Sequence, residues 1–334
     1  MVGNEQRCCP QGGRLTWRTA IVGLGQIGLQ ADLGLDSGAY VYSHARAFAS
    51  HPEFQLVAGV DASATHRDLF SKHYQVPSLG SIGPELALLA PDVIAIAVPT
   101  VAHAQVMEEV LIHCRPKAIL CEKPLSYEVV AAHGMVEGCE RIHASLYVNY
   151  IRRADPAVTE VKARLLDGRI LTPVKGVVWY SKGVFNNGSH FIDLLQYWLG
   201  PVRAHAVLKP GRKLDPDFEP DFRLQFDAGE VVFLVAREED YSHYTIELVA
   251  PNGRLRYDCG GEEVRWQGTV SSTTAPGYVV LDPTPESIPG DLDRIQWHIA
   301  DQLAVALRGD SSSLCQAREA LRLVETIHSI CKNL

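Results

Sequence analysis

The sequence predicts two domains: an α/β domain built on a doubly wound parallel sheet, then an α+β domain with an open, mostly antiparallel sheet. Three observations support this division. A chain of 334 residues corresponds to about two domains. Its first half alternates apolar runs with helical patterns, as in repeated βα units. After Arg153 the pattern becomes strand, turn, strand, which is typical of antiparallel pairing. We assign residues 1–16 to a frayed or disordered tail, 17–150 to the first domain and 151–334 to the second.

Five apolar runs of strand length lie in the first half of the chain. Continuous apolar runs such as VIAIAV are typical of parallel strands that are buried on both faces. These runs are 15–22, 54–61, 93–98, 118–121 and 143–150. Helical patterns lie between them at 43–50, 64–73, 102–113 and 126–141.

The second half has fewer helices and more turns. We expect helices at 155–167 and 189–199, the latter closed by Gly200 and Pro201, with a strand at 173–180 before the short helix. Turn residues between alternating strands predict an antiparallel meander from 204 to 266. A stretch rich in Ser, Thr and Pro, 268–290, is expected to be a long loop. Two helices, 291–307 and 313–332, follow it.

Composition excludes several classes of protein. The formal net charge is −8, and no block of basic residues provides a nucleic-acid footprint. No apolar run approaches the roughly 20 residues of a membrane helix, and the N-terminus lacks the apolar centre of a secretory signal. The eight cysteines form no Cys-x-x-Cys pair, so we expect reduced thiols, no metal site and a cytoplasmic protein.

The first apolar run leads into a G-x-G-x-x-G motif. Its glycines permit a tight turn, close approach of a pyrophosphate and close packing of helix on strand. Amide groups at the start of the following helix would hold the phosphates. The position between strand and helix favours a dinucleotide site over an ordinary glycine turn. The motif residues, which we expect to bind the cofactor, are Gly23, Leu24, Gly25, Gln26, Ile27 and Gly28.

Asp61 ends the second strand, where a carboxylate can accept hydrogen bonds from the adenosine ribose and repel a 2′-phosphate. We therefore expect NAD as the cofactor, with NADP less favoured. Asp61 lies 33 residues after Gly28, whereas the simple motif has about 20. The excess, 29–42, resembles an insertion before the first helix. The alternative is that Asp61 only caps the following turn.

A second motif follows the fourth strand. Glu122-Lys123-Pro124 comes directly after AILC, at the carboxyl end of a parallel strand and beside the expected nucleotide crevice. There a lysine ammonium can stabilise a developing alkoxide or carbonyl oxygen. The ordinary alternative for Lys123 is a solvated surface side chain.

With these motifs the chain resembles the glucose–fructose oxidoreductase, inositol dehydrogenase and rhizopine-catabolism family of nicotinamide-dependent oxidoreductases. The segments that carry the resemblance are GLGQIG at 23–28, SHA at 43–45, VAGVD at 57–61, VPTVAH at 98–103, CEKPLS at 121–126 and NNGSHFIDLL at 186–195. The resemblance implies a Rossmann domain followed by an open-sheet domain, with Lys123 near the nicotinamide. The other expected cofactor contacts are Val98, Pro99, Thr100, His103 and Glu122.

His190 is the general acid/base that the resemblance implies, and histidine suits proton exchange near neutral pH. Asp193 shares its helix face and would orient it or contact a substrate hydroxyl. Many family members have Asp four residues before this histidine, where this chain has Asn186. An amide can position a hydroxyl but cannot take its proton, which puts the full Lys–Asp–His set in doubt.

Weaker candidates surround these residues. An arginine after the fifth strand could bind a phosphate or carboxylate of the substrate, or be a solvated charge. We expect His298 in helix packing first and in the cleft second. The weaker substrate-binding candidates are Tyr150, Arg152, Arg153, Tyr180, Lys182 and Asn187.

The sequence thus predicts an NAD-dependent oxidoreductase acting on a secondary alcohol of a sugar, cyclitol or sugar derivative. Lys123 would polarise the oxygen and His190 would transfer its proton. One alternative is a regulator that binds dinucleotide and sugar without turnover, which Asn186 leaves open. Another is a reductase of a non-sugar substrate such as a linear tetrapyrrole, although the polar residues around His190 favour a polyol. Because an open sheet face needs covering, we expect a homodimer or homotetramer through the second sheet.

Overall fold

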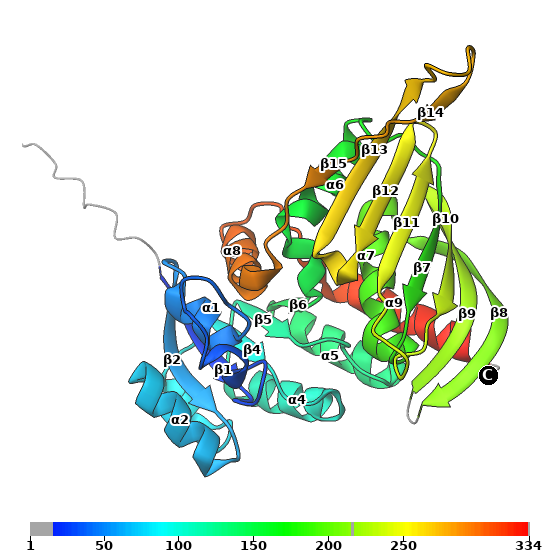
Figure 1. Cartoon of the computed structure of the whole chain (residues 1–334). Coiled ribbons are helices and arrows are strands. Elements are labelled where there is room, and N and C mark those ends of the chain that lie inside the picture. The colour runs from blue at the N-terminus through cyan, green and yellow to red at the C-terminus, as the bar shows by residue number, and fades with distance from the viewer. Residues whose placement is uncertain (1–15, 215–216, 333–334) are drawn as a thin grey trace, which may run out of the picture.

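The computed structural model describes residues 16–214 and 217–332. It contains two sheets, a smaller one formed by the N-terminal half and a larger twisted one formed by the C-terminal half (Figure 1). The expected tail, apart from Thr16, lies outside the described residues. Among the described helices, none combines the length and the apolar character that crossing a membrane requires.

The first sheet is the predicted doubly wound parallel sheet. Its strand order, β16-β6-β5-β4-β1-β2-β3, contains the 3-2-1-4-5-6 order of dinucleotide-binding domains. The five predicted runs form β1 (Trp17–Val22), β2 (Phe54–Val60), β4 (Val93–Ile96), β5 (Ala118–Cys121) and β6 (Ser145–Val148). The predicted helices are α1 (His44–Ser50), α2 (Ala64–Tyr74), α4 (His103–His113) and α5 (Val129–Arg141). Two short elements were not predicted, β3 (Ser78–Leu79) and α3 (Pro84–Leu88).

The insertion interrupts the first helix. A helical turn begins at the glycine motif, where the Leu29 N–H donates to the Gly25 oxygen. The chain then leaves the helix axis, and the helical hydrogen-bond pattern resumes at α1. There the His44 N–H donates to the Ile27 oxygen and the Ala45 N–H donates to the Gly28 oxygen. Residues 31–43 are therefore looped out of one helix. Setting these thirteen residues aside leaves a spacing of about 20 between Gly28 and Asp61, the value of the simple motif.

A buried acid holds the looped-out segment. Asp32 is fully buried and accepts from the Ser43 N–H at 2.8 Å and the Ser43 hydroxyl at 2.7 Å. Arg46 of α1 donates to the Asp32 backbone oxygen and to the oxygens of Leu35 and Tyr40. The segment is thus fixed in place by the helix that it interrupts.

The second sheet has the order β14-β13-β12-β11-β7-β10-β9-β8, with β15 also on β13. Its strands are β7 (Val174–Tyr180), β8 (Val202–Leu214), β9 (Asp217–Phe226), β10 (Gly229–Val235), β11 (Thr245–Ala250), β12 (Gly253–Asp258) and β13 (Glu263–Ser271). The expectation of one continuous meander is wrong. β7 lies between β10 and β11 and pairs parallel with β10, because the turn-rich segment 236–244 carries the chain past the end of β7.

Further corrections concern loops and helix starts. The expected loop 268–290 contains the end of β13 and two strands, β14 (Val279–Leu281) and β15 (Glu286–Ile288), which both pair with β13. α5 begins at Val129 rather than 126. The last helix, α9 (Ala317–Cys331), begins after a capping box formed by Gln316 and Glu319 rather than at 313. The remaining helices are α6 (Pro156–Leu166), α7 (Ser189–Leu199) and α8 (Ile295–Leu307).

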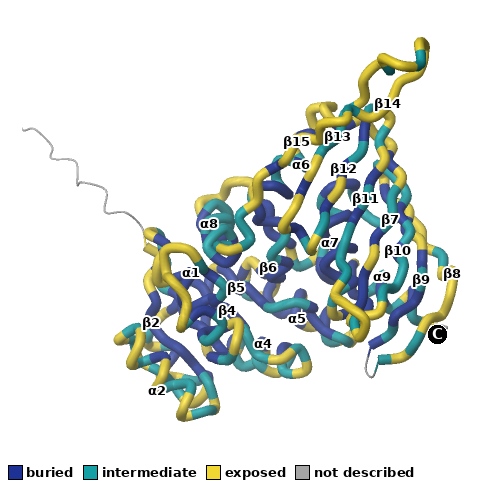
Figure 2. Tube along the Cα trace, viewed as in Figure 1, coloured by how far each residue is buried: buried dark blue, intermediate teal, exposed yellow. Residues whose placement is uncertain are grey.

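The C-terminal segment returns to the first domain. Ile299 and Leu303 of α8 are buried in one apolar cluster with Ile21 and Phe48. β16 (Cys315–Gln316) pairs antiparallel with β6 at the edge of the first sheet. α9 contacts α5 of the first domain as well as β8 and β9 of the second sheet. Figure 2 shows continuous burial through β4 and β5 and through most of α7, and exposure at the tip of the β13–β14 hairpin.

Candidate active site

The glycine motif forms a cradle at the carboxyl end of β1. A Cβ on Gly28 would lie 1.9 Å from the Gly23 oxygen, and one on Gly23 would lie 2.6 Å from the Ala97 oxygen. These two positions are therefore closed by packing. A Cβ on Gly25, in contrast, would meet nothing within 4 Å. Within the described residues, no acceptor is present for the N–H groups of Gln26 and Ile27, both exposed at the start of the interrupted helix. Open space beside free N–H groups fits a pyrophosphate.

Asp61 connects the ends of β1 and β2. Its carboxylate accepts from the Leu24 N–H at 2.7 Å and the Ser63 N–H at 2.8 Å, and lies 3.3 Å from Nδ1 of His66. Burial alone would raise the pKa of Asp61, but these hydrogen bonds lower it, so the carboxylate is ionised at neutral pH. Asp61 thus holds the glycine turn in addition to capping its own turn. The side chain of Leu24 is buried in the core, so Leu24 contributes polar groups only from its backbone: this N–H, and an oxygen that accepts from Nε2 of Gln30 at 3.1 Å.

The segment after β4 is held by His103. Its ring is fully buried, with Nε2 3.0 Å from the Val98 oxygen and Nδ1 3.2 Å from the Leu125 oxygen. Burial lowers the pKa of His103 and outweighs the effect of these carbonyls. The expected cofactor contact is therefore replaced by a positioning role, because both ring nitrogens face backbone. Pro99 is exposed, and Val98 and Thr100 are half-buried at the carboxyl edge of the sheet.

Glu122 anchors a network that the sequence did not reveal. Its Oε1 lies 2.8 Å from Nε2 of His44 and accepts from Nδ2 of Asn149 at 2.7 Å. Asn149 also lies 3.3 Å from Oε1 of Gln296 on α8. Burial would raise the pKa of Glu122, but His44, Asn149 and Lys123 lower it. The network fixes the backbone beside Lys123 from three other elements.

Lys123 lies where the two domains meet. Its Nζ donates to the backbone oxygen of Asn186 at 2.9 Å and to Oδ1 of Asn186 at 3.1 Å. Burial lowers the pKa of Lys123; Arg152 lowers it further, whereas Glu122 and Asp217 oppose the shift. Asn186 belongs to a π-helical turn, Val184–Gly188, that precedes α7. Such turns occur often at functional sites.

Asp217 at the start of β9 holds this turn and was not predicted. Its carboxylate accepts from the N–H groups of Phe185 at 3.1 Å and Asn186 at 2.9 Å. Gly183 enters the turn with φ of 86°, and a Cβ there would lie 2.0 Å from Oδ2 of Asp217. Glycine is therefore required at position 183, and the amide of Asn186 is presented to Lys123 by a rigid turn.

His190 lies in the first turn of α7, four residues after Asn186. It is 9% exposed, and its Nδ1 has no hydrogen-bond partner. Its ring packs edge-on against the ring of Tyr150, with 5.7 Å between the ring centroids. Burial, together with the charges of Arg152 and Lys123, lowers the pKa of His190 well below its ordinary value. The imidazole is therefore neutral at neutral pH and can accept a proton.

Asp193 does not reach His190. It is 1% exposed, and both its oxygens accept from Arg153, at 2.7 and 2.8 Å. Arg153 is 2% exposed and also donates to Glu319 at 2.8 Å. The expected roles of Asp193 at the site and of Arg153 in substrate binding are therefore corrected, since the two side chains neutralise each other in the interior.

The remaining candidates also fall into two groups, those with partners elsewhere in the structure and those beside His190. Tyr180 is fully buried and donates to the Pro220 oxygen at 2.6 Å, so it is a core residue. Lys182 pairs with Glu238 at 2.8 Å, and His298 lies 2.7 Å from Asp291. Beside His190 lie three side chains with a buried polar atom that lacks a partner: Tyr150 Oη, Arg152 Nε and Asn187 Nδ2.

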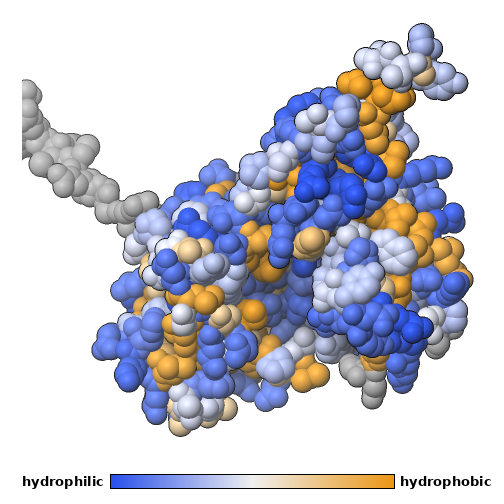
Figure 3. Space-filling model, viewed as in Figure 1, coloured by the Kyte–Doolittle hydropathy of each residue, from blue (hydrophilic) through white to orange (hydrophobic). Residues whose placement is uncertain are grey.

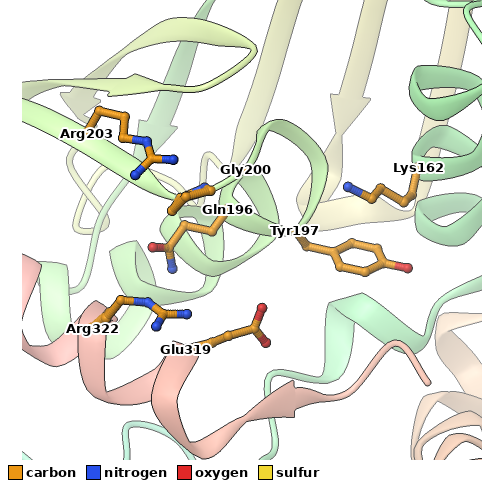
Figure 4. Close-up of a pocket in the computed structure, with 8 residues that line it drawn as sticks. Lys162, Gln196, Tyr197, Gly200, Arg203, Glu319 and Arg322 are labelled. Carbon is orange, nitrogen blue, oxygen red and sulfur yellow. The ribbon is translucent and has the colours of Figure 1, made fainter. Parts of the chain in front are cut away.

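A separate cavity of about 580 Å³ lies farther along α7 (Figure 4). Its wall includes Gln196 and Tyr197 of α7, Glu319 and Arg322 of α9, and Lys162 of α6. None of the predicted site residues lines it. In the described ranges, no group of three or more His, Cys, Asp or Glu side chains is arranged to hold a metal ion.

The comparisons agree with the first domain. Residues 17–150 match a family described as "Oxidoreductase family, NAD-binding Rossmann fold". The chain is 26% identical over 211 residues to inositol 2-dehydrogenase of Rhizobium meliloti (strain 1021), covering 58% of each chain. It is 34% identical over 196 residues to a D-xylose 1-dehydrogenase (NADP(+)) of Haloarcula marismortui, covering 51% of this chain and 54% of that protein. The chain thus matches 58% and 54% of the length of these two curated relatives.

Solved structures share the whole fold. The WlbA dehydrogenase from Bordetella pertussis, in complex with NADH and UDP-GlcNAcA, superposes with a TM-score of 0.71 at 18% identity, covering 96% of both chains. An aldose-aldose oxidoreductase from Caulobacter crescentus superposes with a TM-score of 0.72 at 17% identity, covering 95% of this chain and 98% of that one. At such identities the likeness establishes the two-domain architecture alone.

Proposed function

Because the chain belongs, through residues 17–150, to the glucose–fructose oxidoreductase, inositol dehydrogenase and rhizopine-catabolism family, we propose that it is an NAD-dependent oxidoreductase. Its substrate is a secondary alcohol, or the matching ketone, of a sugar, cyclitol or sugar derivative. The observation that carries this proposal is the meeting of Lys123 and Asn186 beside a buried, neutral His190.

The cradle supports a dinucleotide as cofactor. The open space at Gly25 and the free N–H groups of Gln26 and Ile27 would hold the pyrophosphate, and ionised Asp61 would accept from the adenosine ribose. A carboxylate at that point repels a 2′-phosphate, so NAD is preferred to NADP. When bound, the nicotinamide supplies a hydride acceptor or donor.

The chain's own groups handle the oxygen and its proton. In the oxidation direction, neutral His190 takes the proton of the substrate hydroxyl. The Lys123 ammonium stabilises the negative charge that develops on the oxygen. The Asn186 amide holds Lys123 and orients a neighbouring hydroxyl, but it cannot accept a proton.

Names of relatives support the class of substrate. Inositol 2-dehydrogenase and D-apiose dehydrogenase act on polyhydroxylated substrates by their names. Asn187 and Asn186 line the same turn, and such amides suit hydroxyl groups better than an apolar substrate.

The exposed apolar residues of the second sheet support a homodimer or homotetramer formed there. Figure 3 shows hydrophobic residues at the base of the β13–β14 hairpin. Large apolar side chains that are at least one-third exposed on the strands of this sheet include Trp179, Val207, Leu208, Val249, Val270 and Val279. An apolar face of this kind marks an interaction surface.

The test begins with cofactor binding and continues with turnover. NADH binding is measured by fluorescence titration, and NAD reduction is then assayed with a panel of polyols, aldoses, cyclitols and their acidic derivatives. We expect Lys123→Ala to retain NADH binding and to lose at least about 10²-fold in kcat. NADH binding with no turnover on any panel member would favour the dinucleotide-binding regulator, for which the amide of Asn186 is the supporting observation.

A further inference from the structure

The two neighbouring arginines after β6 have different surroundings. The guanidinium of Arg153 donates hydrogen bonds to the carboxylates of Asp193 and Glu319. Within residues 16–214 and 217–332, no ion pair involves Arg152, and its buried Nε has no hydrogen-bond partner. The Tyr257 hydroxyl, a neutral group, is its hydrogen-bonding neighbour. A half-buried guanidinium without a carboxylate is unusual, because buried charges are normally paired.

Arg152 lies beside the reacting groups. Its guanidinium stacks 5.2 Å from the ring centroid of Phe191, the residue that follows His190. Its charge acts on both His190 and Lys123 and lowers the pKa of each. On the far side it approaches the turn after β12, where a Cβ on Gly260 would lie 3.9 Å from Nη2. Arg152 therefore lies between α7 and the end of the second sheet, next to the proposed chemistry.

No carboxylate of the site is available to this arginine. Glu122 is engaged by His44 and Asn149, and Asp217 by the N–H groups of the π-helical turn. Asp193 has both oxygens on Arg153. The negative charges of Glu122 and Asp217 act on Lys123, but within the described residues no carboxylate forms an ion pair with Arg152, so the positive charge of Arg152 has no counter-charge in contact with it. A pyrophosphate does not account for it, since the glycine cradle lies at the end of β1 rather than beside α7.

We propose that Arg152 binds an oxyanion of the substrate, a carboxylate or a phosphate, so that the enzyme acts on an acidic sugar or polyol. This inference rests on the proposed function, because it places the reacting hydroxyl of the same molecule at Lys123 and His190. The planar fork of an arginine suits either oxyanion. A neutral polyol would leave Arg152 uncompensated and would bind more weakly.

Binding to the NADH-loaded protein tests the proposal without requiring turnover. Titration calorimetry uses three families of probes: neutral alditols, the aldonic and uronic acids of the same configurations, and the corresponding sugar phosphates. We expect at least one acid or phosphate to bind, and Arg152→Gln to weaken it by about 10- to 100-fold, the range for a hydrogen bond to a charged group. Arg152→Lys, which keeps the charge but not the fork, is expected to recover part of this loss.

Arg322→Gln is the matched control, because Arg322 is an exposed arginine on α9 that lines the separate cavity and not the candidate active site. It should leave the affinity for every probe unchanged. The acid and phosphate probes distinguish a carboxylate from a phosphate as the oxyanion: the probe family whose affinity falls in Arg152→Gln identifies the group that Arg152 binds. An equal loss of affinity for neutral and anionic probes in Arg152→Gln would overturn the proposal, and so would a wild type that binds no anionic probe. Failure of NADH to bind would instead overturn the proposed function.

Discussion

The ammonium of Lys123 donates to two oxygens of one residue, the backbone and side-chain oxygens of Asn186, at 2.9 and 3.1 Å. Lys123 follows a strand of the first domain, and Asn186 belongs to a turn of the second. The candidate site is therefore assembled by a contact between domains. Both oxygens are neutral, so Asn186 adds no negative charge that would favour the ammonium form of Lys123.

Asn186→Asp should extend activity to higher pH. The ammonium form of Lys123 is the active one, so activity is lost as pH rises through its pKa, which burial lowers in the wild type. An anion about 3 Å away favours the ammonium and should move this alkaline limb upward by about one unit or more. A pH profile of kcat/KM measures it, with Asn187→Asp as the neighbouring control. Identical alkaline limbs in wild type and Asn186→Asp would contradict the proposed role.

On the acid side, His190 must be neutral for alcohol oxidation. Its pKa is lowered well below the ordinary value, so oxidation should rise with pH well below neutrality and be level near pH 7. For ketone reduction the protonated form is needed, and the profile should fall over the same range. His190→Ala should remove this limb with most of the rate. A limb that persists in His190→Ala would assign the proton to another group.

Substitutions at Gly28 and Gly25 test folding and cofactor binding separately. Gly28→Ala places a Cβ 1.9 Å from the Gly23 oxygen and should lower the free energy of unfolding by about 1–3 kcal/mol or more. Gly25→Ala meets only open space and should change the free energy of unfolding by less than about 0.5 kcal/mol. The same methyl group occupies the approach of the pyrophosphate, so NADH affinity should fall at least about 10-fold. Urea unfolding and NADH titration give the two readouts. Unchanged NADH affinity in Gly25→Ala would exclude this cradle.

Asp61→Asn tests cofactor choice. The amide oxygen can still accept from the Leu24 N–H, so the bond to the glycine turn is kept while the charge and the bond from the Ser63 N–H are lost. We expect the NADPH-to-NADH affinity ratio to rise about 10-fold, because the repulsion of a 2′-phosphate is removed. Asp61→Ala also removes the bond to Leu24 and should weaken both cofactors. Tighter NADPH than NADH binding by the wild type would refute the assignment.

The Arg153–Asp193 pair should be important for stability. Asp193→Ala leaves Arg153 buried without its main partner and should cost about 3 kcal/mol or more in unfolding free energy. Glu319→Gln removes the charge of the more exposed partner and should cost about 1 kcal/mol or less. Replacing both residues, as Arg153→Met with Asp193→Leu, should recover much of the loss. Equal effects of Asp193→Ala and Glu319→Gln in urea unfolding would contradict the burial argument.

The sequence predicted the parallel sheet because fully buried strands such as β4 and β5 are continuous apolar runs. The insertion of β7 between β10 and β11 could not be predicted, because local turns do not reveal which strand fills the middle of a sheet. Lys123 and His190 belong to motifs and could therefore be proposed from the sequence, and their roles stay predictions. Asp217, Asn149 and Gln296 were missed, since they belong to no motif and contact residues far away in the chain. Arg152 and Arg153 were indistinguishable in sequence, because adjacent residues of a short 3-10 helix point to different surroundings.

The looped-out segment of the first helix also sets an order of assembly during synthesis. The Val41 N–H donates to the Asp293 oxygen, the Gln296 N–H donates to the Val41 oxygen, and the Tyr42 hydroxyl donates to the Asp293 carboxylate at 2.5 Å. Tyr42 and Asp293 are 251 residues apart, so a nascent chain carries its complete looped-out segment long before Asp293, the partner of that segment, has left the ribosome. Long-range closures of this kind form late in folding. A chain truncated before Asp293 therefore has the whole glycine motif but lacks the hydrogen bonds that hold Val41 and Tyr42 of the looped-out segment.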